Sequence, residues 1–441
     1  MSTRKNICTS GKHFVDASGR TVILRGVNAT GDAKMPPFRG MDGPQDFAPL
    51  REWGFNTLRL LFIWEAFEPQ AGSYDLAYLD YYEQMVAWAA AEQLHVIVDF
   101  HQDAFSRYAL GGCGEGFPEW AIAAELPRHT PKNDARCEKW GLMASLFPAS
   151  KKANQRVWQR FHENAQNART RYALMTAKVA ERLANHANVI GYELINEPWG
   201  SNEQLTALHA EVEQAIRAHD PHSIMFVAPQ CLYSSGFAKS RLPKPAFGNC
   251  AFAPHYYDAG VILGKRWWGV KPHWLLRNLQ WTAKQWQVPL LLGEYGAPAN
   301  TTRGTAYMHA LHDWLDQEQA SGIQWCYTPH WQADTRDGWN REDLSIVNAN
   351  RELRDNVVLR PYPSHTAGKA LEFISKDGGS FSYRWQQKAA LGATHIYLPP
   401  QLRARTWTVE ADSAMQAQVE RQEEYLLCSA QHDGVINLRM E

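Results

Sequence analysis

The sequence contains no C-x-x-C pair, and its seven cysteines, an odd number, are scattered along 441 residues. We therefore expect neither a zinc site nor a framework of disulfides, and we expect most of the thiols to be buried and free. No apolar stretch is long enough to cross a bilayer, so no integral membrane segment is expected. The first residues are basic but lack an apolar core, so no secretory signal is predicted. The compartment stays open between the cytoplasm and a chain from which a signal was removed.

Neither sign of charge dominates the chain. Lys and Arg number 45 against 46 Asp and Glu, which leaves a net charge of -1. No field of the whole molecule favours a polyanion, so we expect no nucleic-acid partner. Internal repeats and low-complexity tracts are also lacking, while 45% hydrophobic residues are enough for a sizeable core.

Aromatic residues are plentiful, with 18 Trp, 17 Tyr and 17 Phe. Flat amphipathic rings stack on sugar faces and line lipid grooves, although part of them is expected to be ordinary core packing.

Eight short apolar runs rich in β-branched and aromatic residues precede residue 330. They are Thr21–Asn28, Asn56–Ile63, Leu94–His101, Val189–Asn196, Ser223–Ala228, Cys250–Tyr256, Pro289–Tyr295 and Ile323–Thr328. Several are almost continuously apolar, which is typical of parallel strands buried on both faces.

Segments with helical periodicity separate these runs. Leu79, Tyr82, Met85, Val86 and Ala89 share one helical face, and Leu205, Leu208, Val212 and Ile216 share another. Eight strands alternating with helices predict an α/β fold, a (β/α)8 TIM barrel over residues 1–354. Its third unit is too long, so we expect an insertion over about residues 105–155, on the active face.

The pattern changes after Asn350, where short alternating runs such as Phe381–Trp385 and Val435–Arg439 replace helical periodicity. Alternation between turns predicts a C-terminal antiparallel β-sandwich over residues 355–441.

Two glutamates end strands on the expected catalytic rim. Glu197 follows the fourth strand in LINEPW, and Glu294 ends the seventh strand in LLLGEYG. Hydrolysis of a β-glycoside with retention needs two carboxyl groups about 5 Å apart, one to protonate the leaving oxygen and one to attack the anomeric carbon. Each motif alone is weak, but their positions on strands four and seven together predict a retaining β-glycosidase.

With these glutamates, the chain resembles the barrel glycosidases of glycoside hydrolase family 5. DFHQD (Asp99–Asp103), PHYY (Pro254–Tyr257) and the β-domain that begins with RPYP (Arg360–Pro363) look like the endoglycoceramidases and related glucosylceramidases. The resemblance covers nearly the whole chain. It implies a glycolipid or oligosaccharide substrate and no cofactor, and we expect a monomer with at most transient contact with lipid surfaces.

The resemblance also assigns site residues. It makes Glu197 the acid/base and Glu294 the nucleophile, and it implies that Asn196 hydrogen-bonds the sugar 2-hydroxyl. Arg59 and Tyr257 correspond to groups that hold the nucleophile.

Further residues correspond to sugar-binding and supporting groups of the family. They are Asp99, His101, Asp103, Lys34, His255 and Trp325. Strand alternation points positions 99, 101 and 103 to one side, which also permits a metal site, but no second His/Cys cluster completes one, so no metal is expected. Trp331 is a rival for the role of Trp325 as a platform under the sugar.

Three features stay open or secondary. Glu193 shares a strand face with Glu197 and is interpreted as a buried, paired structural carboxylate. Cys113 and Cys137 lie in the same expected insertion and could pair. The aromatic run Lys265–Trp274 could border a groove for lipid chains or pack on the barrel as a surface flap.

Three functions remain in competition. The first is a retaining β-glycosidase for glycosphingolipid-like substrates, of endoglycoceramidase or glucosylceramidase type. The second is a β-glucanase or other polysaccharide hydrolase of the same family. The third is a carbohydrate-binding protein without catalysis, which the presence of both glutamates, Asn196, Arg59 and Tyr257 disfavours.

Overall fold

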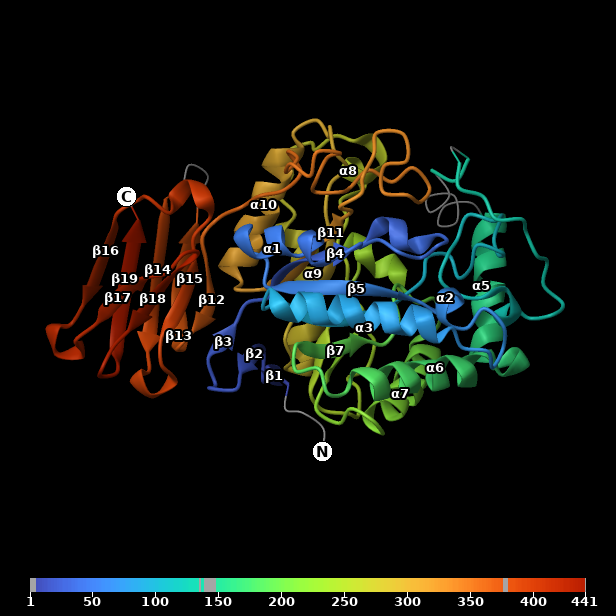
Figure 1. The fold of residues 1–441 in the computed structure, drawn as a ribbon, viewed down its shortest axis with the longest axis horizontal. Coiled ribbons are helices and arrows are strands. Elements are labelled where there is room, and N and C mark those ends of the chain that lie inside the picture. Colours follow the sequence, from blue (N-terminus) through green and yellow to red (C-terminus); the bar gives the residue numbers. More distant parts are fainter. Residues whose placement is uncertain (1–4, 135, 139–147, 376–379, 441) are drawn as a thin grey trace.

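The computed structural model describes residues 5–134, 136–138, 148–375 and 380–440. Eight parallel strands form one sheet in the order β10-β11-β4-β5-β6-β7-β8-β9. Figure 1 labels β4, β5, β7 and β11 of this sheet among the surrounding helices. These strands are β4 (Arg25–Ala29), β5 (Thr57–Ile63), β6 (His95–His101), β7 (Val189–Glu193), β8 (Ile224–Val227), β9 (Cys250–Phe252), β10 (Leu291–Tyr295) and β11 (Ser321–Tyr327). Two parallel bridges, Phe252 to Leu290 and Tyr256 to Tyr295, join β9 to β10 and close the barrel. The expected (β/α)8 barrel is confirmed.

The first expected strand, Thr21–Asn28, is wrong as a single element. Thr21–Val22 forms β3, which pairs with the second sheet, and the barrel strand β4 begins at Arg25. Apolar residues continue from one strand into the next, so the run shows no break where the chain changes sheets.

Helices cover the outside of the barrel. They are α1 (Ala48–Glu52), α2 (Trp64–Phe67), α3 (Leu76–Ala91), α5 (Pro148–His162), α6 (Ala168–Leu183), α7 (Asn202–Arg217), α8 (Ala259–Gly264), α9 (His273–Trp286) and α10 (Gly304–Gln317). Asp75 caps α3 by accepting a hydrogen bond from the Tyr78 amide. The apolar faces expected from periodicity in α3 and α7 are buried, which confirms both helices.

Strand register brings the polar side chains of the barrel side by side. Asn28 of β4 lies beside Arg59 of β5, and Asp99 of β6 lies beside Glu193 of β7. Neighbouring parallel strands place such residues at one level of the barrel, so these groups meet inside its carboxyl end.

The second region consists of two antiparallel sheets. One has the order β1-β2-β3-β12-β15-β18-β17 and the other β13-β14-β19-β16. Its strands are β1 (Ile7–Ser10), β2 (His13–Asp16), β12 (Tyr362–Thr366), β13 (Gly368–Ser375), β14 (Phe381–Gln387), β15 (Thr394–Tyr397), β16 (Trp407–Ala411), β17 (Gln418–Arg421), β18 (Tyr425–Ser429) and β19 (Gly434–Met440). The apolar side chains of β12 to β16, β18 and β19 share one core, as expected for a β-sandwich.

Strands β1 to β3 extend the first of these sheets toward the barrel. Phe14 of β2 packs on Phe226 of β8, with ring centroids 6.1 Å apart, so the hairpin covers the amino-terminal end of the barrel. The division into residues 1–354 and 355–441 stays a prediction, because residues of the first range pair with strands of the second.

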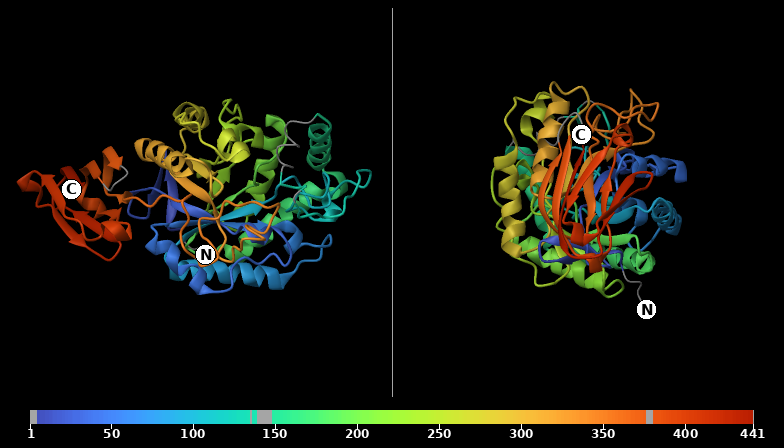
Figure 2. Two further views of the ribbon diagram at one scale, coloured as in Figure 1. Left: turned by 90° about the horizontal axis from the view of Figure 1, so that it is seen from above. Right: turned by 90° about the vertical axis from the view of Figure 1, so that its left-hand side faces the viewer.

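The C-terminal sheets lie at one end of the molecule (Figure 2). Tyr362 and Tyr397 donate hydrogen bonds to the backbone carbonyls of Gly54 and Glu52, at 2.8 and 2.7 Å. A Cβ on Gly54, whose φ is +83°, would lie 2.3 Å from the Tyr397 ring, so glycine allows this contact.

The expected insertion follows β6 and contains a disulfide between Cys113 and Cys137, with Cα atoms 5.4 Å apart. This pairing was left open by the sequence. The thiols of Cys250, Cys326 and Cys428 are buried and free, but Cys8 is exposed and Cys231 is partly exposed. The expectation that most of the seven cysteines are buried free thiols is therefore wrong. None of the helices described here combines the length and the apolar character needed to cross a membrane.

Candidate active site

Arg59 stands at the centre of the polar cluster inside the carboxyl end of the barrel. Its guanidinium is fully buried. Nε donates to Glu193 at 2.6 Å, Nη1 lies 2.9 Å from both Asp99 and Glu294, and Nη2 donates to Asn196 at 2.7 Å. Burial alone would lower the pKa of Arg59, but the three carboxylates outweigh burial and raise it. One cation therefore orients residues from strands β6, β7 and β10.

Glu197 and Glu294 face each other across the barrel mouth. An oxygen of one carboxyl lies within 4.8 Å of an oxygen of the other. The ring of His255 connects them, since Nδ1 is 2.9 Å from Glu197 Oε1 and 3.4 Å from Glu294 Oε2. This separation matches the roughly 5 Å of retaining glycosidases and is too short for the 6.5 Å or more of inverting ones.

Three groups hold the Glu294 carboxylate. Arg59 contacts Oε1 at 2.9 Å, the Tyr257 hydroxyl donates to Oε2 at 2.9 Å, and His255 lies behind Oε2. Burial alone would lower the pKa of His255, but Glu294, Glu193 and Glu197 outweigh burial and raise it to about 10. A cationic His255 thus places a second positive charge, in addition to that of Arg59, beside the Glu294 carboxylate.

Glu193 belongs to the support of the site. It is fully buried and paired with Arg59, as the sequence predicted. Burial would raise its pKa, but Arg59 and His255 lower it to about 2. It thus carries a fixed negative charge behind the two facing glutamates.

The backbone at Glu197 adopts a φ of +37°, a left-handed value that is rare for a residue with a side chain. Gln102 holds this turn: its amide Nε2 lies 2.7 Å from the Asn196 carbonyl and 3.2 Å from the Glu197 carbonyl. Its Oε1 accepts from the Phe105 amide at 2.8 Å, which fixes the glutamine. Sequence reasoning missed Gln102, because it lies on the opposite face of DFHQD from the residues singled out.

A second polar cluster lies beside the glutamates. His101 Nδ1 is 2.6 Å from Asp99, and His101 Nε2 is 3.6 Å from Asp103. Burial alone would lower the pKa of His101, but Asp99 and Glu115 outweigh burial and raise it to about 10. Because His101 contacts both Asp99 and Asp103, the three side chains lie on one side of the chain, as strand alternation predicted.

Lys34 is buried in this second cluster. Its Nζ is 2.6 Å from Asp103, and it lies over the rings of Trp325 and Trp339, at 4.3 and 4.1 Å from their centroids. Burial would raise the pKa of Asp103, but Lys34 and His101 outweigh burial and lower it.

Trp325 is the tryptophan that joins the site. Its ring is stacked on His101, with centroids 5.4 Å apart and planes at 10°. The rival, Trp331, instead donates to Asp343 at 3.1 Å and is covered by Arg354. Trp339 was missed, because its turn follows the last barrel strand and has no periodic pattern.

Glu115, which sequence reasoning also missed, reaches the site from the insertion. It is fully buried, and neither carboxylate oxygen has a hydrogen-bond partner among the described residues. Burial, the largest effect, together with the nearby Asp103 raises the pKa of Glu115 to about 8.

Glycines let the insertion lie directly on the end of β6. Glu115 and Asp103 exchange backbone hydrogen bonds, and a Cβ on Gly114 or Gly116 would lie within 2.8 Å of backbone atoms of that strand end. The GGCGEGF segment was the signal for this contact.

Among the residues that the structure describes, two sets of side chains have the composition of a metal site. They are His101, Asp103 and Glu115, and Glu197, His255 and Glu294, with ligand atoms within 4.8 Å in each set. Glu115 is the third ligand that the sequence did not supply. Lys34 and Arg59 already place a fixed positive charge against Asp103 and Glu294, so neither set needs a cation to balance its carboxylates.

Comparison with known proteins places this geometry in a family. The model described as Cellulase (glycosyl hydrolase family 5) matches residues 15–334, and the one described as Glycoside hydrolase family 5 C-terminal domain matches residues 360–439. Endoglycoceramidase I of Rhodococcus hoagii (strain 103S) is 31% identical over 424 residues, which cover 88% of this chain and 78% of that protein. Glucosylceramidase of Aspergillus fumigatus is 33% identical over 152 residues, which cover 28% and 20%.

Among solved structures, Endo-glycoceramidase II from Rhodococcus sp. in its ganglioside GM3 complex has the same fold, with a TM-score of 0.79 at 24% identity. The match covers 97% of this chain and 99% of that one. Since the first family model alone spans most of the barrel and more than half of the sequence, the chain belongs to glycoside hydrolase family 5.

Proposed function

We propose that this protein is a retaining β-glycosidase in which Glu197 is the acid/base and Glu294 the nucleophile. The observation that carries the proposal is the separation of their carboxylate oxygens, within 4.8 Å, at the ends of different barrel strands. Such a pair can reach the leaving oxygen and the anomeric carbon of one bound sugar at the same time.

In the first step the Glu294 carboxylate attacks the anomeric carbon and forms a glycosyl ester, while Glu197 transfers its proton to the departing oxygen. Arg59 and the Tyr257 hydroxyl hold the attacking oxygens in place. In the second step Glu197 takes a proton from water, whose oxygen attacks the same carbon and releases Glu294. The product keeps the β configuration, because two displacements invert the centre twice.

Asn196 is suited to the sugar 2-hydroxyl. Its Oδ1 accepts from Arg59 at 2.7 Å, and one hydrogen of Nδ2 is donated to the Gln102 carbonyl at 2.9 Å. The second Nδ2 hydrogen remains to bond the 2-hydroxyl, where a hydrogen bond strengthens as the ring becomes oxocarbenium-like.

The second polar cluster is proposed to bind the glycone. Lys34, His101 and Asp103 supply charged donors and acceptors, and Glu115 supplies a carboxyl group, beside the flat ring of Trp325. Polar groups around an aromatic platform suit the hydroxyls and apolar face of a sugar.

The proposed substrates are glycosphingolipid-like, with either an intact glycan or a single glucose as the group released. The relatives named endoglycoceramidase and glucosylceramidase support this class. The active unit is proposed to be a monomer, and contact with lipid surfaces is taken up below.

Two isosteric variants test the catalytic assignment. Glu294→Gln and Glu197→Gln should each reduce kcat on glucosylceramide by about 10³-fold or more, with an unchanged circular dichroism spectrum. Azide should restore turnover of an activated aryl β-glucoside in a Glu197→Ala variant. The anion attacks the anomeric carbon of the glycosyl-enzyme without needing a base, and it releases Glu294 with a β-glycosyl azide as the product. Near-wild-type rates in either glutamine variant would reject the assignment.

A polysaccharide hydrolase is the second candidate, and the family model described as Cellulase favours it. Glucosylceramide, a ganglioside and cellopentaose should be digested in parallel and separated by thin-layer chromatography. Release of the glycan from the ganglioside indicates endo cleavage, and release of glucose from glucosylceramide alone indicates exo cleavage. Products from cellopentaose only would defeat the lipid proposal, while binding of sugar without hydrolysis over a day would indicate a catalytically silent binding protein.

A further inference from the structure

The chain between the fifth and seventh barrel strands has an unusual charge. Residues 221–293 contain the eight cations Lys239, Arg241, Lys244, Lys265, Arg266, Lys271, Arg277 and Lys284, and Asp258 is their single acidic residue. The whole protein has a net charge of -1, so this excess is local. Asp258 caps α8 by accepting from the Val261 amide, which leaves the cations without an acidic neighbour in their own segment.

Large apolar side chains project from the same segment. Among the described residues, twelve large hydrophobic side chains are exposed, and six of them lie here: Leu232, Phe237, Leu263, Trp268, Val270 and Trp274. The three exposed aromatic side chains of that set are all in this group, with exposed fractions of 65% for Phe237, 70% for Trp268 and 63% for Trp274. Phe237 and Trp274 line one pocket, while Leu263 lies on α8 and Trp268 and Val270 lie in the loop from α8 to α9. The exposed apolar groups thus gather on neighbouring elements, as at an interaction surface.

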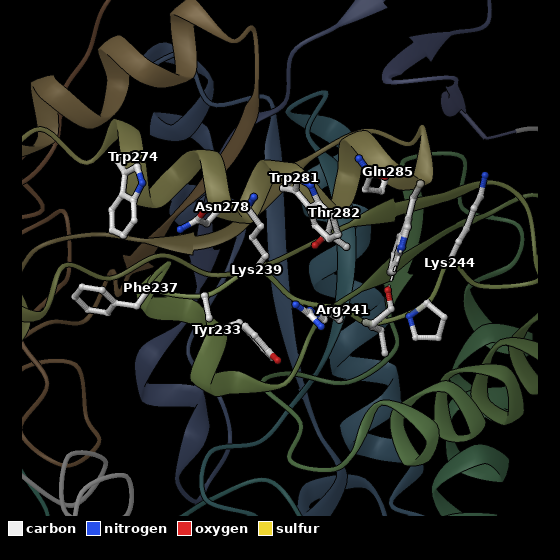
Figure 3. A pocket seen from close by; sticks show the side chains of 14 residues that line it. Tyr233, Phe237, Lys239, Arg241, Lys244, Trp274, Asn278, Trp281, Thr282 and Gln285 are labelled. Atoms are coloured by element: carbon white, nitrogen blue, oxygen red, sulfur yellow. Dashed lines mark hydrogen bonds between the residues drawn. The ribbon is translucent and has the colours of Figure 1, made fainter.

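A pocket of about 1040 Å³ lies within this surface, between the loop after β8 and helix α9 (Figure 3). Phe237 and Trp274 stand at one end of it and Lys244 at the other, with Lys239 and Arg241 between them. These three cations are exposed, and no salt bridge recorded for the described part of the chain engages them. Lys239 lies over the ring of Trp281 instead, 5.4 Å from its centroid.

The surface is continuous with the active site through one short element, the 3-10 helix Cys231–Ser235. Tyr233 lines the pocket, while the next residue, Ser234, donates to Glu197 at 3.3 Å. The Ser234 carbonyl also accepts from the Tyr257 amide at 3.1 Å. The Phe237 and Trp274 end of this surface therefore lies toward the mouth of the barrel. Lys244, close to Cys250 at the start of β9, lies toward the amino-terminal end.

We propose that this surface, defined by Phe237, Leu263, Trp268, Val270 and Trp274 with Lys239, Arg241 and Lys244, docks the enzyme on a bilayer that contains anionic phospholipid. Tryptophan and phenylalanine side chains enter the boundary between the lipid headgroups and the acyl chains. There the rings contact acyl chains on one side and hydrated headgroups on the other. Lysine and arginine side chains beside them pair with lipid phosphates and carboxylates. Charge complementarity selects the anionic bilayer as the occupant.

The docking proposal does not depend on the identity of the substrate, since vesicles without glycolipid test it. The full-length protein is sedimented with vesicles of phosphatidylcholine alone or with about one third phosphatidylserine, at low and high salt. We expect binding to the anionic vesicles that falls with salt, because the ionic contribution is screened over roughly 10 Å at 0.1 M salt. Equal binding to both compositions, or no binding, would overturn the proposal.

Two triple variants separate the apolar and ionic parts. Phe237→Ser, Trp268→Ser and Trp274→Ser together, and Lys239→Gln, Arg241→Gln and Lys244→Gln together, should each lower the vesicle partition coefficient by about tenfold or more. Matched controls are Leu76→Ser with Leu174→Ser, and Lys369→Gln, Arg384→Gln and Lys388→Gln, all at exposed positions outside the surface. The controls should bind like the wild type.

Hydrolysis of a water-soluble aryl β-glucoside shows whether each variant is folded, and it should stay within about twofold of wild type, since catalysis needs no docked lipid. Wild-type vesicle binding by either triple variant would overturn the proposal. So would a loss restricted to hydrolysis of detergent-dispersed glycolipid, which would make the surface a subsite for the lipid chains of the substrate.

Discussion

Two buried arginine clusters lie at different places in the barrel, and their charge balance differs. Arg25, at the start of β4, contacts Asp316 at 2.7 Å, and Arg360 contacts Asp316 and Asp313 at 3.0 and 2.9 Å. Two guanidinium groups thus meet two carboxylates. At the carboxyl end, the single guanidinium of Arg59 contacts Asp99, Glu193 and Glu294.

The difference separates a structural cluster from a chemical one. In the Arg25 cluster two guanidinium groups balance two carboxylates, and His309 Nδ1 lies 3.1 Å from Arg360 Nη2. Arg360 also donates to the Ser375 carbonyl at 3.2 Å, so this cluster holds the barrel to the C-terminal sheets. In the Arg59 cluster one guanidinium faces three carboxylates, and the imidazoles of His255 and His101 supply the remaining positive charge. Acid/base catalysis needs side chains that can exchange protons, and here such side chains lie close to paired carboxylates.

The sharpest way to break this contrast is to remove the central arginine of the chemical cluster. Arg59→Gln should reduce kcat/KM on an aryl β-glucoside by about 10³-fold or more, since three carboxylates lose their common donor and the nucleophile loses its position. Steady-state kinetics on protein shown to be folded by circular dichroism measures this. Activity close to wild type would mean that Arg59 is merely structural.

A substitution in the Arg25 cluster should lower the free energy of unfolding and leave kcat unchanged. Asp316→Asn leaves two buried guanidinium groups facing each other and should lower the free energy of unfolding by about 3 to 5 kcal/mol. Denaturant titration measures this, and kcat of the folded protein should not change. Asp313→Asn on the same helix is the control, with a small effect expected because its side chain is 49% exposed. A fall in kcat in Asp316→Asn would erase the distinction between the two clusters.

A smaller effect is expected at the turn that carries the acid/base. Gln102→Leu removes the amide that bonds the carbonyls of Asn196 and Glu197, and it should lower kcat by roughly 10- to 100-fold with little change in KM. Asn188→Leu is the control, since this buried amide also bonds a backbone carbonyl, that of Val86, but far from the glutamates. If both variants lose stability and neither loses kcat, Gln102 does not position Glu197.

The smallest effect concerns Glu115, which should be protonated in the folded protein up to a pH of about 8 because burial raises its pKa. An unfolded glutamate ionises near its ordinary value of about 4.3, so folding binds a proton between these two values. The stability that Glu115 contributes is complete below the lower value and is lost as the pH rises toward 8.

Glu115→Gln removes this proton uptake. The Tm of the variant relative to wild type should therefore increase between pH 5 and pH 8, by roughly 2 to 4 °C. Differential scanning calorimetry at several pH values measures it. A difference that stays constant with pH would show that Glu115 is ionised in the folded protein throughout this range.

The barrel could be predicted from the sequence because its signal is local. Continuous apolar runs such as Asn56–Ile63 predict strands, and the periodic apolar faces of α3 and α7 predict helices, without information from distant parts of the chain. The two glutamates could be placed for the same reason, since Glu197 directly follows such a run and Glu294 lies near the end of another.

The missed features depend on contacts between distant segments. β3 is two residues long and lies in its sheet between β2 and β12, and β12 follows some 340 residues later. Glu115 reaches His101 only because Gly114 and Gly116 let the insertion lie against β6. Gln102 acts through backbone carbonyls nearly a hundred positions away, which no periodic pattern records.

The double-displacement mechanism requires a covalent glycosyl-enzyme intermediate at Glu294. A 2-deoxy-2-fluoro aryl β-glycoside slows the second step, so the glycosyl-enzyme should accumulate and add the mass of one fluorosugar to the protein. Peptide mass spectrometry of the trapped enzyme is predicted to find that sugar on Glu294 and nowhere else. A sugar on Glu197, or an unlabelled protein that releases the α-anomer as its first product from a normal substrate, would contradict the assignment.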